Sequence, residues 1–292
     1  MLNSVLRRVE ALPYPTTARW VFYRIAQEFG AKKGDYKKFL KWTSQARKRF
    51  WNGWHPALLV DDTRKITSRG GGYASPEEWI KSFWDSECYL SVQDKQSNIL
   101  LVLFEAAAMH HQFDYYLGPL RIPCSPFGGD ASIRHKWNIA KYLEDRFRTF
   151  KKPVVVLYYG DFDPKGMIIP RSAMKDIWKW INCPELGSTL GGSVKADSEV
   201  WKSENDMFRW IRVGLFRNQT ERLGIPENPD KPGTYQWEGA EDEAARSLIY
   251  EGIEGFWDTD IIRETEEVED ATTKRWRKLL DRSISESDIT ES

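Results

Sequence analysis

The segment that most constrains the fold is VVVLYYGDFDPKG, at residues 154–166. Six consecutive apolar or aromatic residues are typical of a strand that is buried on both faces, as in a parallel sheet covered by helices. The strand ends at Gly160, and Asp161 and Asp163 follow it directly. In open parallel sheets, ligands bind at the carboxyl ends of the strands, so these aspartates lie where a binding site is expected.

Asp161 and Asp163 are separated by one residue, which lets both carboxylates point to the same side of an extended chain. Clustered carboxylates repel each other and favour a hard cation such as Mg²⁺. Asp, Pro and Gly are also common turn residues, so a surface turn without a metal is the simpler alternative. The position after a buried strand favours the interpretation as a Mg²⁺ site.

Strands and helices alternate around this segment, which predicts an α/β fold whose parallel sheet is covered by helices. The predicted strands are 88–92, 119–124 and 154–159, and the predicted helices are 96–111, 131–149, 170–181, 207–223 and 241–257. The polar stretch 184–206 is predicted to be a loop. The charged tail, 258–292, is predicted to be an exposed helix followed by disorder.

The first 75 residues hold 15 Lys and Arg but 5 Asp and Glu, although the whole chain has a net charge of zero. Predicted helices at 16–29 and 35–50, followed by a turn and a short strand within 52–64, fit a winged-helix-like domain. A basic domain of this kind suggests a polyanionic partner such as DNA, and a solvated basic face is the alternative. The candidate phosphate contacts are Arg24, Lys37, Lys38, Lys41, Arg47, Lys48, Arg49, Lys95 and Lys165.

The cysteines and the apolar runs limit which classes of protein and which cellular compartments fit this sequence. Three widely spaced cysteines, at 88, 124 and 183, form no metal-binding pattern and favour a reducing compartment. The longest apolar run, 99–108, is interrupted by Glu105 and is too short to span a membrane. The first residues lack the apolar region of a signal peptide, so we expect a cytoplasmic protein. The boundaries that we expect are 1–75 for the basic domain, 76–257 for the sheet domain and 258–292 for the tail.

GDFDPKG, at 160–166, resembles the aspartate motif of the Toprim domain. The order of segments is similar to that of the topoisomerase VI A subunit and the related meiotic double-strand-break proteins, and closest to the phage and bacterial branch of that superfamily. LLVDDTR, at 58–64, and RVGLFRNQTERLGIPENPDK, at 212–231, resemble segments of the same branch. The resemblance extends over about residues 15–255.

TTARWVFYR, at 16–24, resembles the stretch in which these families place an arginine four residues before a nucleophilic tyrosine. The resemblance implies that Tyr23 attacks a DNA phosphodiester and that Arg19 stabilises the phenolate or the phosphate. It also implies Mg²⁺ bound by Asp161 and Asp163, and a homodimer that combines the tyrosine of one subunit with the metal site of the other. The topoisomerase VI A subunit works with an ATPase partner subunit, and because this chain has no P-loop, any ATP-driven strand passage would need such a second protein.

Toprim domains also have a glutamate after an earlier strand. If the predicted strand 88–92 keeps its alternation, Gln93 takes this position, and a shift of one residue places Asp94 there, followed by Lys95. Asp94 is therefore the third candidate metal ligand. A cap of the following helix is an alternative role for Asp94.

Four hypotheses follow. The first is tyrosine-mediated DNA cleavage of the topoisomerase VI A type. The second is a Toprim nuclease that uses metal-activated water, and the third is a catalytically degenerate protein that binds DNA or builds a complex. The fourth is a haloacid-dehalogenase-like phosphatase, which ranks low because Lys165 stands where that family usually has Thr or Val.

Overall fold

The computed structural model describes residues 2–11, 16–18, 21–22, 30, 32–59, 75–128, 132–187, 189–195 and 197–288. Its centre is a six-stranded sheet with the order β2-β1-β3-β6-β5-β4. The strands are β1 (Ile99–Phe104), β2 (Cys124–Pro126), β3 (Val154–Tyr159), β4 (Leu190–Lys195), β5 (Ser198–Ser203) and β6 (Phe208–Gly214). The neighbours β2, β1, β3 and β6 are parallel, whereas β6, β5 and β4 are antiparallel.

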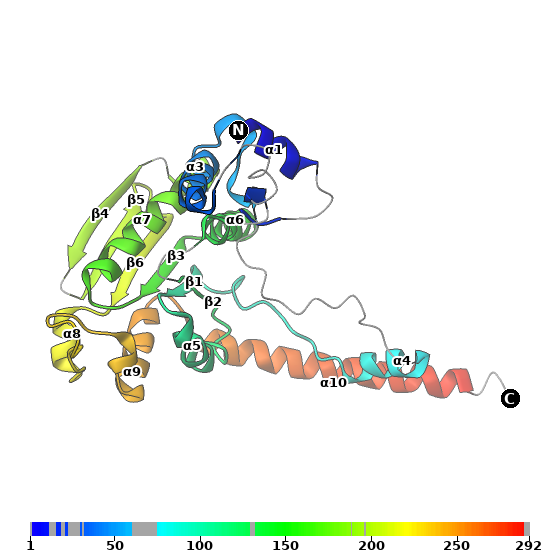
Figure 1. Ribbon diagram of the computed structural model, residues 1–292. Coiled ribbons are helices and arrows are strands. Elements are labelled where there is room, and N and C mark those ends of the chain that lie inside the picture. The colour runs from blue at the N-terminus through cyan, green and yellow to red at the C-terminus, as the bar shows by residue number, and fades with distance from the viewer. Residues whose placement is uncertain are drawn as a thin grey trace.

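Helices cover both faces of this sheet, which explains why β1 and β3 are apolar at every position (Figure 1). One face packs against α6 (Ile133–Phe150) and α7 (Pro164–Trp180), and the other packs against α5 (His110–Leu117) and α9 (Asp242–Ile253). A short helix, α8 (Arg217–Arg222), follows β6. The prediction of an α/β fold with a mostly parallel, helix-covered sheet is confirmed.

The N-terminal part has a separate core. Residues of α1 (Leu2–Glu10) and α3 (Tyr36–Lys48) pack there around Phe22, Trp54 and Leu59. Three short 3₁₀ helices complete the described part of this region, at Lys33–Asp35, Trp51–Gly53 and Pro56–Leu58. Helix α3 confirms the helix predicted at 35–50. Residues 52–59 contain 3₁₀ helices and no strand, so the short strand is not found in the described part of 52–64, and 60–64 lie outside the described residues. Most of the helix predicted at 16–29 also lies outside them.

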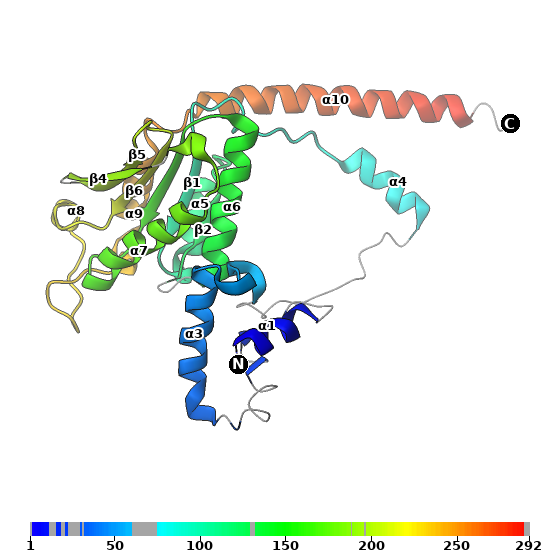
Figure 2. The ribbon, with the colours of Figure 1, turned by 90° about the horizontal axis from the view of Figure 1, so that it is seen from above.

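Two helices form an arm that extends away from the sheet. The longest helix, α10 (Asp260–Asp288), confirms the helix predicted in the tail, and the predicted disorder beyond it lies outside the described residues. Figures 1 and 2 show α10 projecting from the body, and Figure 2 shows α4 (Pro76–Asp85) slanting away from it. Trp84 joins the two helices, because its indole Nε1 donates to Asp281 Oδ1 at 3.2 Å and its carbonyl accepts from Arg277 Nε at 3.1 Å. No helix in the described ranges is long and apolar enough to cross a membrane.

Several predicted elements are wrong. The segment 88–92 is no strand, because its backbone donors bind side chains of α10: Cys88 N donates to Thr273 Oγ1 at 2.9 Å, and Leu90 N donates to Glu269 Oε1 at 2.5 Å. Residues 99–104, in the first half of the predicted helix 96–111, form strand β1. The predicted strand 119–124 is irregular up to its last residue, and strand β2 begins there, at Cys124. The predicted loop 184–206 contains the β4–β5 hairpin, and the predicted helix 207–223 begins with strand β6.

Helix α7 begins six residues earlier than predicted. Asp163 is its N-cap and accepts a hydrogen bond from Gly166 N, and Pro164 takes the first helical position. This pair is a favourable helix start, because the carboxylate satisfies an unpaired backbone donor and proline loses nothing there. The helix then continues through Pro170.

Candidate acidic site at the carboxyl end of the sheet

Glu105 and Asp161 meet at the carboxyl ends of two neighbouring parallel strands. Strands β1 and β3 pair in register, with Phe104 opposite Tyr159, so the residues that follow the two strands lie side by side. Glu105 N donates to Tyr159 O at 2.8 Å, and Glu105 Oε2 accepts a hydrogen bond from Asp161 N at 3.2 Å. The glutamate is thus held directly against the chain segment that carries the two aspartates.

Two glycines make this close approach possible. A Cβ atom on Gly160 would lie 2.7 Å from Glu105 Oε2, and one on Gly166 would lie 3.1 Å from the same oxygen and would overlap Asp161 O. Any larger residue at either position would push against the carboxylate or the backbone. The glycines of the GDFDPKG motif therefore provide the space into which Glu105 fits.

The segment that carries the aspartates is held from several sides. Asp161 Oδ1 accepts from Trp237 N at 2.9 Å, and Asp163 Oδ1 accepts from Gly166 N at 2.5 Å. Phe162 and Tyr235 form an antiparallel bridge. Within the described ranges, the second oxygen of each aspartate accepts no hydrogen bond, so each carboxylate keeps an oxygen for another ligand.

The electrostatic environment favours a cation. Burial raises the pKa of Glu105 above its ordinary value, and the negative charges of Asp161 and Asp163 raise it further. Burial also raises the pKa of Asp161, with smaller contributions from the carboxylates of Glu238 and Asp163. Clustered, partly desolvated carboxylates are costly to ionise without a counter-charge, and a bound cation would remove that cost.

Arg212 lies beneath the acidic residues and is fully buried in β6. Its two terminal nitrogens donate to Asp161 O at 2.7 Å and to Leu215 O at 2.8 Å, and desolvation lowers its pKa to about 10. Its charge lowers the pKa of both Glu105 and Asp161. Arg212 therefore fixes the backbone of the aspartate segment and places a buried positive charge near the carboxylates, while its hydrogen bonds go to backbone carbonyls.

The side chains of the acidic site are too few to hold a metal ion by themselves. In the part of the chain that the structure describes, no group of three or more His, Cys, Asp and Glu side chains could hold a metal as it stands. Mg²⁺ is commonly held by one or two protein carboxylates, with waters and substrate phosphate oxygens as the other ligands. Glu105 and Asp161 fit such an open set, and Asp163, which caps α7, is less available for it.

The structure places Asp94 far from this site, which corrects its prediction as a metal ligand. Asp94 is exposed and precedes β1, whereas Glu105 follows β1, so a strand of six residues, or about 20 Å, separates them. Gln93 is buried and its amide donates to Leu100 O at 3.3 Å. Lys95 is at the same end and its ammonium lies 3.3 Å from Thr265 Oγ1, so it does not belong to the acidic site either.

The sequence analysis does not point to Glu105, because the apolar run before it also fits the predicted helix 96–111. The signal was present: ILLVLFE, at 99–105, is six apolar residues followed by an acid, as VVVLYYGD is at 154–161. Both runs are buried strands of one sheet, and both end in an acidic residue at its carboxyl edge. The glutamate expected after an earlier strand therefore has a candidate in Glu105.

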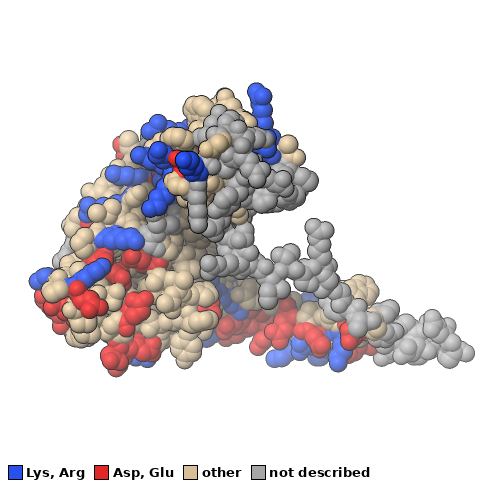
Figure 3. Space-filling model, in the orientation of Figure 1, with Lys and Arg blue, Asp and Glu red and all other residues tan. Residues whose placement is uncertain are grey.

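The predicted catalytic residues Tyr23 and Arg19, and Arg24 with them, lie outside the described residues. Of the predicted phosphate contacts, those with exposed side chains are Lys37, Lys38, Lys41, Arg49, Lys95 and Lys165. Figure 3 shows basic side chains gathered over α3, and acidic ones lower on the same face. Lys165 stands in the first turn of α7, two residues after Asp163.

Two predicted phosphate contacts have structural partners. Arg47 is buried and donates to Pro56 O at 2.6 Å and to Leu59 O at 3.1 Å, so it holds the N-terminal core together and is not available to DNA. Lys48 pairs with Asp176 of α7 at 3.0 Å. This ion pair joins the basic helix α3 to the sheet domain.

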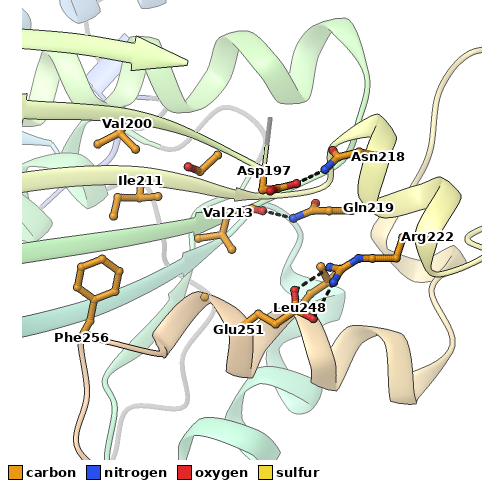
Figure 4. Close-up of a pocket in the computed structure, with 12 residues that line it drawn as sticks. Asp197, Val200, Ile211, Val213, Asn218, Gln219, Arg222, Leu248, Glu251 and Phe256 are labelled. Carbon is orange, nitrogen blue, oxygen red and sulfur yellow. Dashed lines mark hydrogen bonds and ion pairs between the residues drawn. The ribbon is translucent and has the colours of Figure 1, made fainter. Parts of the chain in front are cut away.

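A separate cavity of about 560 Å³ lies between β5, β6, α8 and α9. Figure 4 shows that its polar groups face one another: Arg222 pairs with Glu251 at 2.7 Å, and Asn218 hydrogen-bonds to Asp197. Its floor is formed by apolar side chains of the sheet, such as Val200 and Ile211. Because its charges pair with each other, the cavity offers less for binding or catalysis than the acidic site.

No protein-family model, no curated protein and no solved structure matches this chain.

Proposed function

We propose that this protein binds DNA and cleaves its strands in a Mg²⁺-dependent reaction, with a Toprim-like sheet domain and a winged-helix-like basic domain of the topoisomerase VI A type. The supporting observation is the meeting of Glu105 and Asp161 at the carboxyl ends of β1 and β3. The resemblance of GDFDPKG to the Toprim motif requires a glutamate from an earlier strand, and Glu105 meets that requirement. Glu105 would take the position of the third acidic residue, and Asp94 would have no part in the site.

Glu105 and Asp161 would hold the cation, and Asp163 would hold α7 and the motif in place through its cap. A Mg²⁺ ion bound there would hold a DNA phosphate and neutralise the charge that develops during its transfer. Arg212 keeps the backbone of Asp161 fixed. Exposed Lys165 and the lysines of α3 would contact neighbouring phosphates without reading bases.

Tyr23 is the proposed nucleophile, with Arg19 beside it in the chain. Its phenolate oxygen would form a bond with the phosphorus, and the bond from phosphorus to the 3′ oxygen would break. The DNA 5′ end would then be linked to the tyrosine, and the 3′ oxygen would take up a proton. A phenol with a pKa of about 10 is a poor nucleophile near neutral pH, and Arg19 would help by stabilising the phenolate. A homodimer would combine the tyrosine of one copy with the acidic site of the other, and an ATPase partner would be needed for strand passage.

Hydrolysis by metal-activated water is the second candidate. The acidic site is assembled from residues of β1, β3 and the segments after them, so water could be activated there without any N-terminal residue. The third candidate is a catalytically degenerate protein, which would bind DNA without cleaving it.

The test is incubation of the purified chain with supercoiled plasmid and Mg²⁺, stopped with detergent and analysed with and without protease. Tyr23→Phe, Glu105→Gln and Asp94→Asn are compared with the unchanged protein. Asp94→Asn is the matched control, because it also removes one carboxylate but at the opposite end of β1.

Protein-linked cleaved DNA that is lost in Tyr23→Phe and Glu105→Gln, and kept in Asp94→Asn, would support the tyrosine mechanism. Cleavage that persists in Tyr23→Phe but not in Glu105→Gln would support hydrolysis. Equal activity of Glu105→Gln and the unchanged protein would refute the assignment of the site. Intact plasmid together with a salt-sensitive gel shift would support DNA binding without cleavage.

A further inference from the structure

A small hollow opens on the surface of the basic N-terminal region, where α1, α3 and the 3₁₀ helix Trp51–Gly53 meet. It measures about 150 Å³, and its lining residues are Leu2, Trp42, Gln45, Ala46, Arg49 and Trp51. Trp42 and Trp51 are each 45% exposed, whereas Ala46 is 5% exposed. The small side chain of Ala46 therefore lies at the bottom of the hollow, and the two indole rings remain accessible from outside.

The segment that carries Trp51 is held in place on both sides of it. The ring of Phe50 contacts the ring of Trp137 in α6 at 5.7 Å between centroids, and Asn52 Nδ2 donates to Asn3 Oδ1 at 2.9 Å. Phe50 and Asn52 have positive φ angles of 51° and 46°, which are uncommon for residues other than glycine. These contacts hold the backbone in that conformation, so Trp51 is exposed by a fixed segment.

Cations lie on the same face of α3 as Trp42. Lys38, Gln45 and Arg49 are separated from Trp42 or from one another by three or four residues, so they share one side of the helix. Lys38 and Arg49 are about 16 Å apart along the helix axis, with Trp42 between them. Among the described residues Arg49 has no ion pair, and Lys38 contacts the exposed carboxylate of Asp35 only at 4.0 Å. Such an exposed contact is weak, so both cations are available to an anionic ligand.

The combination of exposed indole rings and available cations fits a single strand of nucleic acid. Its bases are flat and stack on aromatic side chains, and its phosphates bind Lys and Arg. A duplex would use the cations but not the tryptophans, because its bases are already stacked and paired. An uncharged apolar ligand would use the tryptophans but not the cations. A nucleotide with an unpaired base uses both.

We propose that this hollow binds an unpaired base of single-stranded DNA, with Arg49 and Lys38 on the phosphates beside it. The base stacks on the exposed indole rings of Trp42 and Trp51. The amide of Gln45 offers a donor and an acceptor at the same place, so it can bond to the edge of any base. The exposed Lys37 and Lys41 add positive charge along the helix, where Figure 3 shows basic side chains gathered.

This inference rests on the DNA binding of the proposed function and adds that part of the DNA is unpaired where it meets the basic region. Its test measures binding by the full chain in the presence of EDTA. A failure to cleave DNA would therefore leave the result intact, and a failure to bind an unpaired base would leave the acidic site untouched.

The test compares a short thymidine oligonucleotide with an oligonucleotide of the same length that has phosphates and sugars but no bases, by fluorescence anisotropy. We expect the unchanged chain to bind the thymidine oligonucleotide at least about tenfold more tightly. Trp42→Ala and Trp51→Ala should each bring this ratio close to one and leave the affinity for the abasic oligonucleotide unchanged, which also shows that the variant is folded. Trp42→Phe should keep most of the preference, because phenylalanine can still stack.

Arg49→Gln separates the phosphate contact from the stacking. It should weaken the binding of both oligonucleotides alike and lower the slope of log affinity against log salt concentration by about 0.7. The matched control is Trp79→Ala, which removes a tryptophan that is 51% exposed on α4 and should keep the full preference.

Equal affinity of the unchanged chain for the two oligonucleotides would overturn the inference, as would the absence of binding to either. So would a preference that both Trp42→Ala and Trp51→Ala retain, or one that Trp79→Ala loses. Tighter binding of the matching uridine RNA than of the thymidine oligonucleotide would overturn DNA as the occupant of the hollow.

Discussion

Substituting Gly160 with alanine is the most direct test of the acidic site, because the structure gives both the size and the direction of the effect. The added Cβ would lie 2.7 Å from Glu105 Oε2 and 2.9 Å from Tyr158 Cε1. Ordinary contacts begin at 3.4 Å, so the carboxylate would have to withdraw by at least 0.7 Å. Glu105 can move, because the oxygen is at the end of a flexible side chain.

The ring of Tyr158 cannot move in the same way. It is fully buried and contacts the rings of Phe127 and Trp210. Inserting a methyl group against such a packed ring typically costs about 1–3 kcal/mol. We therefore expect Gly160→Ala to be less stable by about 2 kcal/mol, and to lose most Mg²⁺-dependent activity even where it is fully folded.

The assay is urea unfolding followed by tryptophan fluorescence, together with plasmid cleavage measured well below the unfolding midpoint. Gly191→Ala is the control, because a Cβ there meets no atom within 4 Å. It should be as stable as the unchanged protein or slightly more stable, since glycine is unfavourable in a strand. If Gly160→Ala unfolds at the same urea concentration as the unchanged protein and cleaves DNA equally well, the packing of Glu105 against Gly160 is refuted.

Three further predictions concern stability and DNA affinity. Because the pKa of Glu105 is higher in the folded than in the unfolded state, metal-free stability should fall as pH rises through that raised pKa. Glu105→Gln should reduce this fall to the part that the raised pKa of Asp161 contributes, and should abolish the stabilisation by Mg²⁺ in thermal unfolding. An unchanged Mg²⁺ response would contradict the site. Gly252→Ala should destabilise the protein by about 1–3 kcal/mol, although alanine favours helices, because its Cβ would overlap the Tyr159 hydroxyl. Tyr159→Phe removes that hydroxyl and should reduce the cost of Gly252→Ala. If the shifts in urea midpoint of the two single variants simply add in the double variant, the contact is contradicted. Arg47→Met should lower the free energy of unfolding by about 3 kcal/mol, because it removes buried hydrogen bonds. Lys37→Ala should leave stability unchanged and lower the slope of log DNA affinity against log salt concentration by about one. The reverse result in unfolding and gel-shift assays would contradict the burial of Arg47.

The sequence determined the elements whose signals are local. The apolar run 154–159 and the Asp161 and Asp163 that follow it predicted a buried strand with an acidic end, because a strand covered on both faces needs apolar side chains at every position. The helices α3, α6 and α9 were predicted from their periodicity. That Gly160 and Gly166 leave space for the carboxylate of Glu105 was not predicted from the sequence.

The tertiary structure alone decided what meets the aspartates. An apolar run such as 99–104 fits either a helix or a buried strand, and only its pairing with β3 in the sheet makes it a strand. That pairing puts Glu105, 56 residues away in the chain, against Asp161 and leaves Asp94 at the opposite end. The stretch 88–92 alternates like a strand, yet its backbone donors bind side chains of α10, more than 170 residues later. Local patterns fix which segments are buried, whereas the partner of a strand or of a carboxylate depends on contacts between distant residues, which no local pattern encodes.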